Sequence, residues 1–139
     1  MKISYAVTVC DEFAEIQTLL SKLISYKQEQ DEIVVLVDLN KNSPASYLLK
    51  YLREFEANNK IKLEEGYFNG HFADWKNKLN ALCSGDFVFQ IDADEYLPDE
   101  FIDLMHQILD ANPEVDLYYV PRINTVSGLT EEHIQKWGW

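Results

Sequence analysis

The chain has 139 residues, a length that suits one domain, and apolar residues make up 47% of it, which excludes a disordered chain. Its 24 Asp and Glu residues outnumber 12 Lys and Arg residues, and the formal net charge of −12 excludes the basic footprint of a nucleic-acid-binding protein. Because no apolar run reaches the roughly 18 residues of a membrane span and the amino terminus has no signal-peptide pattern, we expect a cytoplasmic protein without a transmembrane segment.

The first half of the chain alternates between strand and helix patterns. Residues 3–10 and residues 32–38 are rich in β-branched and apolar side chains, so both are predicted to form buried parallel strands. Apolar side chains recur at helical spacing over residues 13–24, which predicts an amphipathic helix between the two strands. A serine followed by a proline at residues 43–44 predicts the beginning of a second helix, and two asparagines at residues 58–59 predict its end.

The alternation continues through the centre of the chain. Residues 61–64 are predicted to form a short third strand, and residues 72–82 carry apolar side chains at helical spacing. The Ser-Gly pair at residues 84–85 predicts a helix end of the C-cap type. Residues 86–91 predict a fourth strand, which runs directly into the acidic sequence Asp-Ala-Asp-Glu at residues 92–95.

The last part of the chain adds two helices and one strand. A proline and an aspartate at residues 98–99 predict the beginning of a helix, and an Asn-Pro pair at residues 112–113 predicts its end. Residues 116–120 predict a fifth strand, and residues 130–132 predict the beginning of a short last helix. Strands that alternate with helices indicate a parallel α/β sheet, in a single domain over residues 1–139.

Acidic side chains follow three of the predicted strands. Asp11 follows the first strand, Asp38 follows the second, and Asp92 begins the acidic motif after the fourth. In open α/β sheets, ligands bind in the crevice beyond the carboxyl ends of the strands. We therefore expect these side chains to lie at one ligand-binding site.

The motif itself suggests a metal. Asp92 and Asp94 stand two residues apart in an extended segment, so their side chains point the same way and repel each other unless a cation or protons lie nearby. A divalent cation, Mn²⁺ or Mg²⁺, would take oxygen ligands from the protein and from a diphosphate together. The alternative is that Asp92, Asp94 and Glu95 form a solvated turn before a helix, and the position of the motif after an apolar strand favours the metal.

The sequence over residues 72–95 resembles the core of family 2 glycosyltransferases, which have a GT-A fold. That core has a helix with an Arg/Lys-Asn pair, here at residues 76–77, then a turn with Gly-Asp, a strand, and Asp-Ala-Asp-Glu or Asp-Ala-Asp-Asp. Residues 7–12 and 34–38 resemble the first two strands of the family. The resemblance covers most of the chain, and it implies a Rossmann-like, mostly parallel sheet with helices on both faces.

The resemblance also implies an activity. Family members transfer a sugar from a nucleotide-diphosphate sugar to an acceptor hydroxyl with inversion, and they depend on a metal. By this resemblance Asp94 would bind the metal on the donor diphosphate, with Asp92 and Glu95 as further residues of the metal site.

Donor contacts are implied in the same way. Asp92 would also contact the donor ribose or sugar, and Asp38 would contact the base or the ribose. In the family a second aspartate often follows the one at the position of Asp38, and this sequence does not have it. The other residues assigned to the donor pocket are Asp11, Lys76 and Asn77.

Family members continue well past this motif, and their later part supplies the acceptor site and the catalytic base. This chain ends at Trp139, so we expect a donor-binding half without the acceptor-side part. Glu131, Glu132 and His133 are candidates for a base, but the beginning of a helix explains the two glutamates better. The catalytic residue therefore stays unassigned, and the acceptor is left open as a glycan, a lipid or a protein.

Two other functions fit parts of the sequence. A binding module or scaffold without catalysis would explain the missing acceptor-side part. A nucleotidyltransferase also places acidic residues at strand ends, but residues 10–13 lack the glycine and the positive charge that such enzymes usually have there. We also consider a homodimer, because an exposed sheet edge would allow two copies to pair.

Some side chains allow both a structural and a functional interpretation. Trp75 is predicted to be helix core rather than a platform for a sugar, and Arg122 to form a surface ion pair rather than to reach a phosphate. His71 is predicted to be a surface or capping residue. Cys10 and Cys83 are predicted to be small buried residues without a disulfide or a zinc ion.

Overall fold

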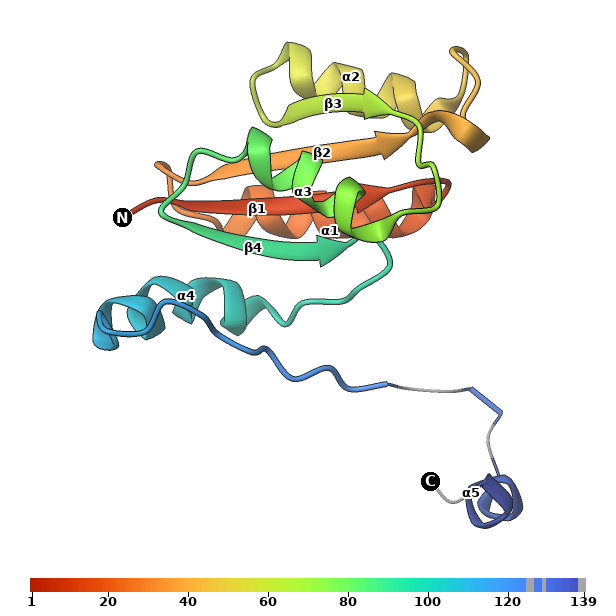
Figure 1. Ribbon diagram of the computed structural model, residues 1–139, viewed down its shortest axis with the longest axis vertical. Helices are drawn as coiled ribbons and strands as arrows, with labels where there is room; N and C mark the ends of the chain where they lie inside the picture. Colours follow the sequence, from red (N-terminus) through yellow and green to blue (C-terminus); the bar gives the residue numbers. More distant parts are fainter. Residues whose placement is uncertain (125–126, 129, 138–139) are drawn as a thin grey trace.

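The computed structural model describes residues 1–124, 127–128 and 130–137 (Figure 1). Four strands pair in parallel in the order β3-β2-β1-β4. The strands are β1 Ile3–Val9, β2 Glu32–Asp38, β3 Lys62–Gly66 and β4 Phe87–Asp92. The helices are α1 Phe13–Tyr26, the 3-10 helix η1 Leu39–Lys41, α2 Tyr47–Ala57, α3 Phe72–Leu82, α4 Asp99–Ala111 and α5 Glu131–Trp137.

Helices cover both faces of the sheet. The larger core joins odd-numbered side chains of β1 and β2, such as Val7 and Val35, to α1, α2 and α4. A smaller core joins Ala6 and Val34 to Leu79 of α3 on the other face. The two-residue repeat of a strand explains this division, because alternate side chains point to opposite faces. This arrangement confirms the predicted α/β, Rossmann-like fold class.

The register of the strands brings their carboxyl ends to one edge of the sheet. Thr8 of β1 pairs with Asp92 of β4, and Asp38 of β2 pairs with Gly66 of β3. Thr8 and Asp92 both point toward the face that α3 covers, where they contact Lys76. Side chains that are far apart in the sequence therefore meet beyond the ends of the parallel strands, as predicted.

The second helix begins later than the sequence predicted. Ser43 lies in a turn, where its carbonyl accepts a hydrogen bond from the Ser46 amide at 2.9 Å. Ser46 is the N-cap, because its hydroxyl accepts a hydrogen bond from the Leu49 amide at 3.2 Å. The predicted end of the helix is confirmed: Asn59 follows the C-cap with a φ of 57°, a left-handed conformation that asparagine tolerates.

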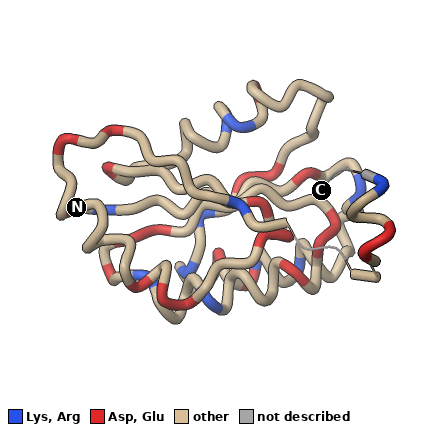
Figure 2. The backbone as a smooth tube through the Cα atoms, turned by 90° about the horizontal axis from the view of Figure 1, so that it is seen from below, with Lys and Arg blue, Asp and Glu red and all other residues tan. Residues whose placement is uncertain are grey.

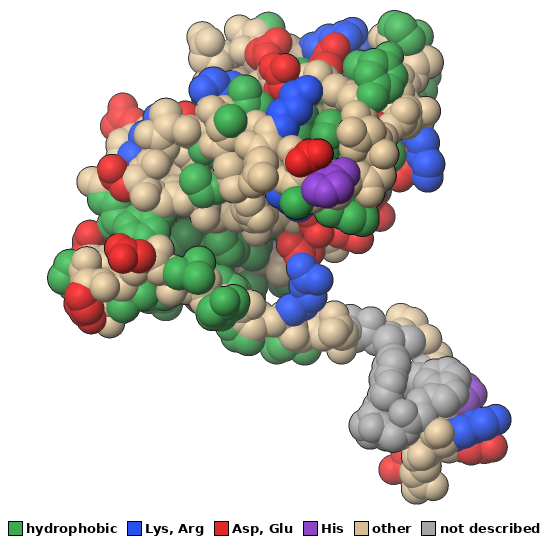
Figure 3. Space-filling view, in the orientation of Figure 1, with side chains coloured by type: hydrophobic (Ala, Val, Ile, Leu, Met, Phe, Trp, Pro, Cys, Tyr) green, Lys and Arg blue, Asp and Glu red, His purple; other side chains and the backbone are tan. Residues whose placement is uncertain are grey.

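The predicted fifth strand is wrong. Residues 116–120 run as an extended segment that makes no ladder with the sheet in the described part of the chain (Figure 1). Side chains anchor it instead: the Tyr118 ring packs edge-on against Phe87 at 6.3 Å, and its hydroxyl donates to the Asn112 carbonyl at 3.2 Å. Hydrophobic side chains gather over α4 and this segment (Figure 3).

Without a fifth strand, β4 is an edge strand of the described sheet. The pairing of two copies at a sheet edge, as a homodimer, stays a prediction.

The end of the third helix also differs from the prediction. Cys83 is the C-cap of α3 and has extended backbone, so the Ser-Gly pair does not cap the helix. Gly85 allows a close approach instead. A Cβ atom there would lie 2.7 Å from the Ser4 amide nitrogen and 2.9 Å from the Lys2 carbonyl oxygen. Only a residue without a side chain lets the chain pass β1 on its way into β4.

The remaining elements follow the predictions. The predicted last helix is α5, which begins at Glu131 and lies apart from the sheet (Figure 1). Acidic residues are spread along the whole backbone rather than gathered in one segment (Figure 2). No helix among the described residues has the length and apolar character to cross a bilayer.

The two cysteines differ in part from their prediction as small buried residues. Cys10 and Cys83 are free thiols, and each is half-buried rather than fully buried.

Candidate functional site

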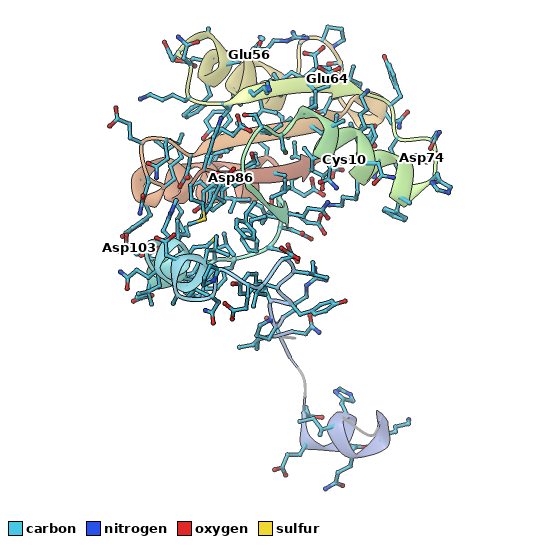
Figure 4. The ribbon with its side chains drawn as sticks, turned by 60° about the vertical axis from the view of Figure 1, so that its left-hand side comes forward. Cys10, Glu56, Glu64, Asp74, Asp86 and Asp103 are labelled. Atoms are coloured by element: carbon cyan, nitrogen blue, oxygen red, sulfur yellow. The ribbon has the colours of Figure 1, made fainter. Side chains whose placement is uncertain are left out.

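A cleft of about 270 Å³ lies at the carboxyl ends of β1, β2 and β4. Strand ends form its floor, and α3 with the loop before it forms one wall. The lining residues are Thr8, Val9, Cys10, Glu12, Asp38, Phe68, Phe72, Trp75, Lys76, Asp92, Ala93 and Asp94. Cys10 lies at this end of the sheet, and Asp86 lies at the opposite end (Figure 4). The cleft thus occupies the position where open α/β sheets bind ligands.

Lys76 holds Asp92 in place at the floor of the cleft. The Lys76 ammonium lies 2.7 Å from Asp92 Oδ1 and 3.0 Å from the Thr8 hydroxyl, and that hydroxyl donates to the same Asp92 oxygen at 2.9 Å. Burial would raise the pKa of Asp92, but the hydrogen bonds from Lys76 and Thr8 and the Lys76 charge outweigh it, so the pKa lies below its usual value. Asp92 is therefore a carboxylate at neutral pH.

Asp38 lines the cleft, but it is buried and both of its oxygens accept hydrogen bonds. Oδ1 accepts hydrogen bonds from the Asn40 amide at 3.0 Å, the Asn40 side chain at 2.7 Å and the Phe68 amide at 3.3 Å. Oδ2 accepts a hydrogen bond from the Cys10 thiol at 3.8 Å. Burial and then nearby carboxylates, Asp38 foremost, raise the pKa of Cys10, so the thiol stays protonated. Both oxygens of the buried Asp38 therefore have partners, and Oδ2, whose partner is only a weakly donating thiol, is the one that a ligand in the cleft could share.

Three aromatic rings line the cleft beside Asp38. Phe68 contacts Phe72 with ring centroids 4.8 Å apart, and it meets Trp75 edge-on at 5.9 Å. Trp75 also packs against the smaller core, which confirms its predicted place in the helix core. Its position in the cleft as well was not predicted. A flat apolar wall beside a carboxylate is suited to a planar ring with polar edges.

The acidic motif divides into engaged and free carboxylates. Glu95 accepts a hydrogen bond from the Asp92 amide at 2.9 Å, and its other oxygen pairs with Arg122, which confirms the ion pair predicted for that arginine. Asp94 is exposed and makes no hydrogen bond or ion pair with the described residues. No three His, Cys, Asp or Glu side chains in the described ranges form a ready metal cage.

Two predicted donor-pocket residues lie outside the lining of the cleft. Asp11 is exposed and lies 3.7 Å from the Lys41 ammonium. Asn77 is exposed on α3, one residue past Lys76. Glu12 lines the cleft instead of Asp11, and its carboxylate accepts a hydrogen bond from the Cys10 amide at 2.7 Å. Thr8 was not predicted as a residue of the site, because only the pairing of β1 with β4 brings it to Asp92.

Other candidates from the sequence have structural roles. His71 caps α3, since its Nδ1 atom accepts a hydrogen bond from the Asp74 amide at 3.1 Å. Glu131 and Glu132 lie in the first turn of α5, where negative charge is favourable. His133 follows them, and its amide donates to the Thr130 hydroxyl at 3.3 Å. None of the base candidates lines the cleft.

Comparison with known proteins adds a family and a fold. Residues 4–138 match the family model for glycosyl transferase family 2. No curated protein sequence matches the chain. The structure of S. aureus TarS residues 1–349 superposes with a TM-score of 0.64 at 22% identity, over 81% of this chain and 33% of that one. A complex of the same TarS fragment with UDP gives a TM-score of 0.63 at 21% identity over the same shares.

A further TarS structure gives a TM-score of 0.62 at 21% identity and covers 81% of this chain and 20% of that one. At these identities the likeness establishes the fold alone. This chain spans about a third of the length of the TarS fragment that it resembles.

Proposed function

We propose, since the chain belongs to glycosyl transferase family 2, that the cleft binds a nucleotide-diphosphate sugar and serves its transfer, with inversion, to an acceptor hydroxyl. The observation that carries this proposal is the division of the acidic motif at the rim of the cleft. Asp92 is held by Lys76, while Asp94 stands exposed beside it. The UDP present in a TarS complex of the same fold supports this use of the cleft.

The nucleoside would occupy the aromatic end of the cleft. Phe68 and Trp75 offer ring faces and edges, and Asp38 Oδ2 offers a hydrogen-bond acceptor beside them. A base or ribose has N–H or O–H groups that donate to such an oxygen. This arrangement supports the predicted contact of Asp38 with the base or the ribose.

The diphosphate would occupy the end with Lys76 and Asp94. Among the described residues that line the cleft, Lys76 is the sole cation, and the whole chain has a net charge of −12. A diphosphate therefore needs more positive charge than the protein supplies. Mg²⁺ usually binds through one or two carboxylates together with the phosphates of the substrate. Asp94, with Asp92 beside it, fits a cation of that kind, whereas both oxygens of Glu95 are already engaged.

The transfer would be a single displacement. The acceptor oxygen forms a bond to the anomeric carbon, the bond from that carbon to the phosphate oxygen breaks, and the electron pair leaves with the nucleoside diphosphate. The acceptor proton passes to a general base. A bound divalent cation would stabilise the negative charge of the leaving diphosphate. Lys76 lies where it would add to that stabilisation.

Calorimetry with UDP and GDP, with and without Mn²⁺, tests the proposal. We expect one nucleotide to bind only with the metal, and Asp94→Asn to weaken that binding at least tenfold. Asp103→Asn is the matched control, because it makes the same change on the exposed surface of α4 (Figure 4). Equal affinity of the wild-type chain and Asp94→Asn would show that the metal site is assigned wrongly.

Donor binding without transfer is a second candidate function. It is favoured by the absence of every base candidate from the lining of the cleft, as far as the chain is described. In that case the nucleotide sugar would bind with the same metal dependence, but no nucleoside diphosphate would be released. Measuring the release of UDP from a bound UDP-sugar separates the two functions.

A further inference from the structure

Two side chains share one oxygen of Asp92. The Thr8 hydroxyl donates to Oδ1 at 2.9 Å, and the Lys76 ammonium lies 2.7 Å from the same atom. The other oxygen, Oδ2, accepts no hydrogen bond from the described residues, and the Asp92 side chain is 46% exposed. The carboxylate is therefore held through Oδ1, and Oδ2 is the oxygen that it offers to a ligand in the cleft.

The sheet fixes the position of Thr8. This residue lies on β1, which has β2 on one side and β4 on the other, and it pairs directly with Asp92 in the parallel register. Its carbonyl accepts a hydrogen bond from the Ala93 amide at 3.1 Å, so the contact between the two strands continues past the aspartate. The branched Cβ atom of threonine also restricts the rotation of its side chain. The Thr8 hydroxyl therefore has little freedom to leave Oδ1.

The position of Lys76 is less restricted. Its ammonium stands at the end of a flexible four-carbon stem on α3, and the side chain is partly exposed. The ammonium contacts the Thr8 hydroxyl at 3.0 Å as well as Asp92. A diphosphate in the cleft carries more negative charge than one carboxylate, so it would compete with Asp92 for this cation.

The Thr8 hydroxyl connects the two charged groups. A hydroxyl has one O–H group that donates and two lone pairs that accept. Thr8 donates to Asp92 and accepts from Lys76, so the three side chains form a closed triangle. The Asp92 amide in turn donates to Glu95 at 2.9 Å. A binding group keeps its geometry when its neighbours lock its rotamer in this way.

We infer that Thr8 is a positioning residue: its hydroxyl keeps the Asp92 carboxylate in place, with Oδ2 free, when Lys76 turns toward a bound diphosphate. Thr8 acts through Asp92 and not on the ligand. The inference rests on the proposed function for the diphosphate, but not for the hydrogen bond between Thr8 and Asp92. Valine has the shape of threonine without the hydroxyl, and serine keeps the hydroxyl without the methyl group, so Thr8→Val and Thr8→Ser separate hydrogen bonding from packing.

Nuclear magnetic resonance of the isotope-labelled chain tests the positioning without a ligand. Three-bond couplings from the backbone to the Asp92 carboxyl carbon report the rotamer of that side chain, and the signal is assigned by its loss in Asp92→Asn. Lys76→Met removes the ammonium from Asp92, as a diphosphate would. We expect Asp92 to keep one rotamer in Lys76→Met and in Lys76→Met combined with Thr8→Ser. In Lys76→Met combined with Thr8→Val, we expect Asp92 to average over several rotamers.

Two results of this measurement would overturn the inference. One is rotamer averaging in Lys76→Met alone, which would show that the lysine and not Thr8 positions Asp92. The other is a single rotamer in Lys76→Met combined with Thr8→Val, which would show that the hydroxyl is not needed.

Calorimetry with Mn²⁺ and the nucleotide that the wild-type chain binds, UDP or GDP, tests the consequence for affinity. We expect Thr8→Val to weaken binding by about three- to tenfold, which lies within the contribution of one hydrogen bond to a charged group. Thr8→Ser should stay within about twofold of the wild-type chain, because it keeps the hydroxyl. If Thr8→Val binds as tightly as the wild-type chain, or Thr8→Ser as weakly as Thr8→Val, the hydroxyl has no positioning role.

The positioning role and the proposed function can fail separately. If the wild-type chain binds neither nucleotide with Mn²⁺, the proposed function is wrong, and the couplings of Asp92 alone decide whether Thr8 positions it. If a nucleotide binds but the couplings show either of the two contrary results, the role of Thr8 is wrong and the proposed function stands.

Discussion

The two ends of the sheet use the same acidic residue types in opposite ways. At the amino ends of the strands, Glu32 accepts hydrogen bonds from the Ser4 hydroxyl and the Ser84 amide, each at 2.6 Å, and pairs with Lys2 at 3.0 Å. Asp31 nearby is buried and lies 2.7 Å from His106 Nε2. These carboxylates are fully engaged in joining strands and helices.

At the carboxyl ends the carboxylates are left partly open. Asp94 makes no hydrogen bond or ion pair with the described residues, and the second oxygen of Asp38 has only the weakly donating Cys10 thiol as a partner. Asp92 is held, but it remains 46% exposed. The difference teaches that acidic content does not mark the proposed site. What marks it is an exposed carboxylate without a partner among the described residues, Asp94, since Asp38 has as many hydrogen-bond partners as Glu32. Changes at the amino ends should therefore lower stability, and changes at the carboxyl ends should lower ligand affinity.

The largest expected effect is on stability, from Gly85→Ala at the amino ends. The new Cβ would lie 2.7 Å from the Ser4 amide nitrogen, which belongs to the central strand and cannot move freely. We expect a loss of about 2–3 kcal/mol in the free energy of unfolding, measured with urea, and unchanged UDP affinity. In Gly66→Ala the new Cβ would meet the flexible end of Lys78 at 2.8 Å and the Trp75 ring at 3.2 Å, and not the backbone, so this control should lose less stability. Equal losses of unfolding free energy in the two variants would contradict the difference between the two ends of the sheet.

A smaller effect on stability is expected from Glu32 in acid. Burial would raise the pKa of Glu32, but hydrogen bonds from Ser4, Ser84 and Lys2 outweigh it and lower the pKa to about 2. Because the folded pKa lies below the ordinary value of 4.5, its contribution is fully present above that value and is lost as the pH falls from about 4.5 towards 2. After allowance for screening by solvent, we expect roughly 1–2 kcal/mol.

Urea unfolding of the wild-type chain and Glu32→Gln measures this contribution. The two chains should differ most near neutral pH and converge in acid. A difference that stays constant down to about pH 2 would mean that Glu32 does not titrate as described.

The smallest effect concerns affinity, from Lys76→Met at the carboxyl ends. Methionine keeps much of the length of the side chain but removes the cation that holds Asp92 and faces the proposed diphosphate. We expect UDP to bind about fivefold more weakly, since the pair is partly exposed, with a loss of stability below about 1 kcal/mol. Calorimetry and urea unfolding of the same preparation measure both. A stability loss without an affinity loss would place Lys76 with the structural residues of the other end.

Most of the fold follows from local patterns in the sequence. The bounds of β1 and β2 were predicted within one residue, because a continuous run of apolar and β-branched side chains strongly favours a buried strand. The extended segment at residues 116–120 also consists largely of apolar and aromatic side chains, but it forms no ladder in the described part of the chain. A strand also needs a partner, and pairing is not a local property. The beginning of α2 was missed because Ser43 and Ser46 are both good caps, and backbone geometry selected the second.

The site was predictable only in part. Asp38, Asp92 and Lys76 were found from strand ends and from a family resemblance, and all three line the cleft. Thr8 was missed because its contact with Asp92 depends on the β1–β4 register, which joins residues 84 positions apart. Asn77 stays a prediction from the resemblance, which assigns positions, while the rotation of α3 places Lys76 and not Asn77 in the lining of the cleft.

A crystal structure of the chain with UDP and Mn²⁺ tests the central claim most directly, because the anomalous signal of manganese locates the metal. We predict manganese bound to Asp94 and to the phosphate oxygens, with the uracil ring against Phe68 and Trp75. Manganese or UDP bound elsewhere, or a metal bound to Glu95 with Asp94 left free, would contradict the account.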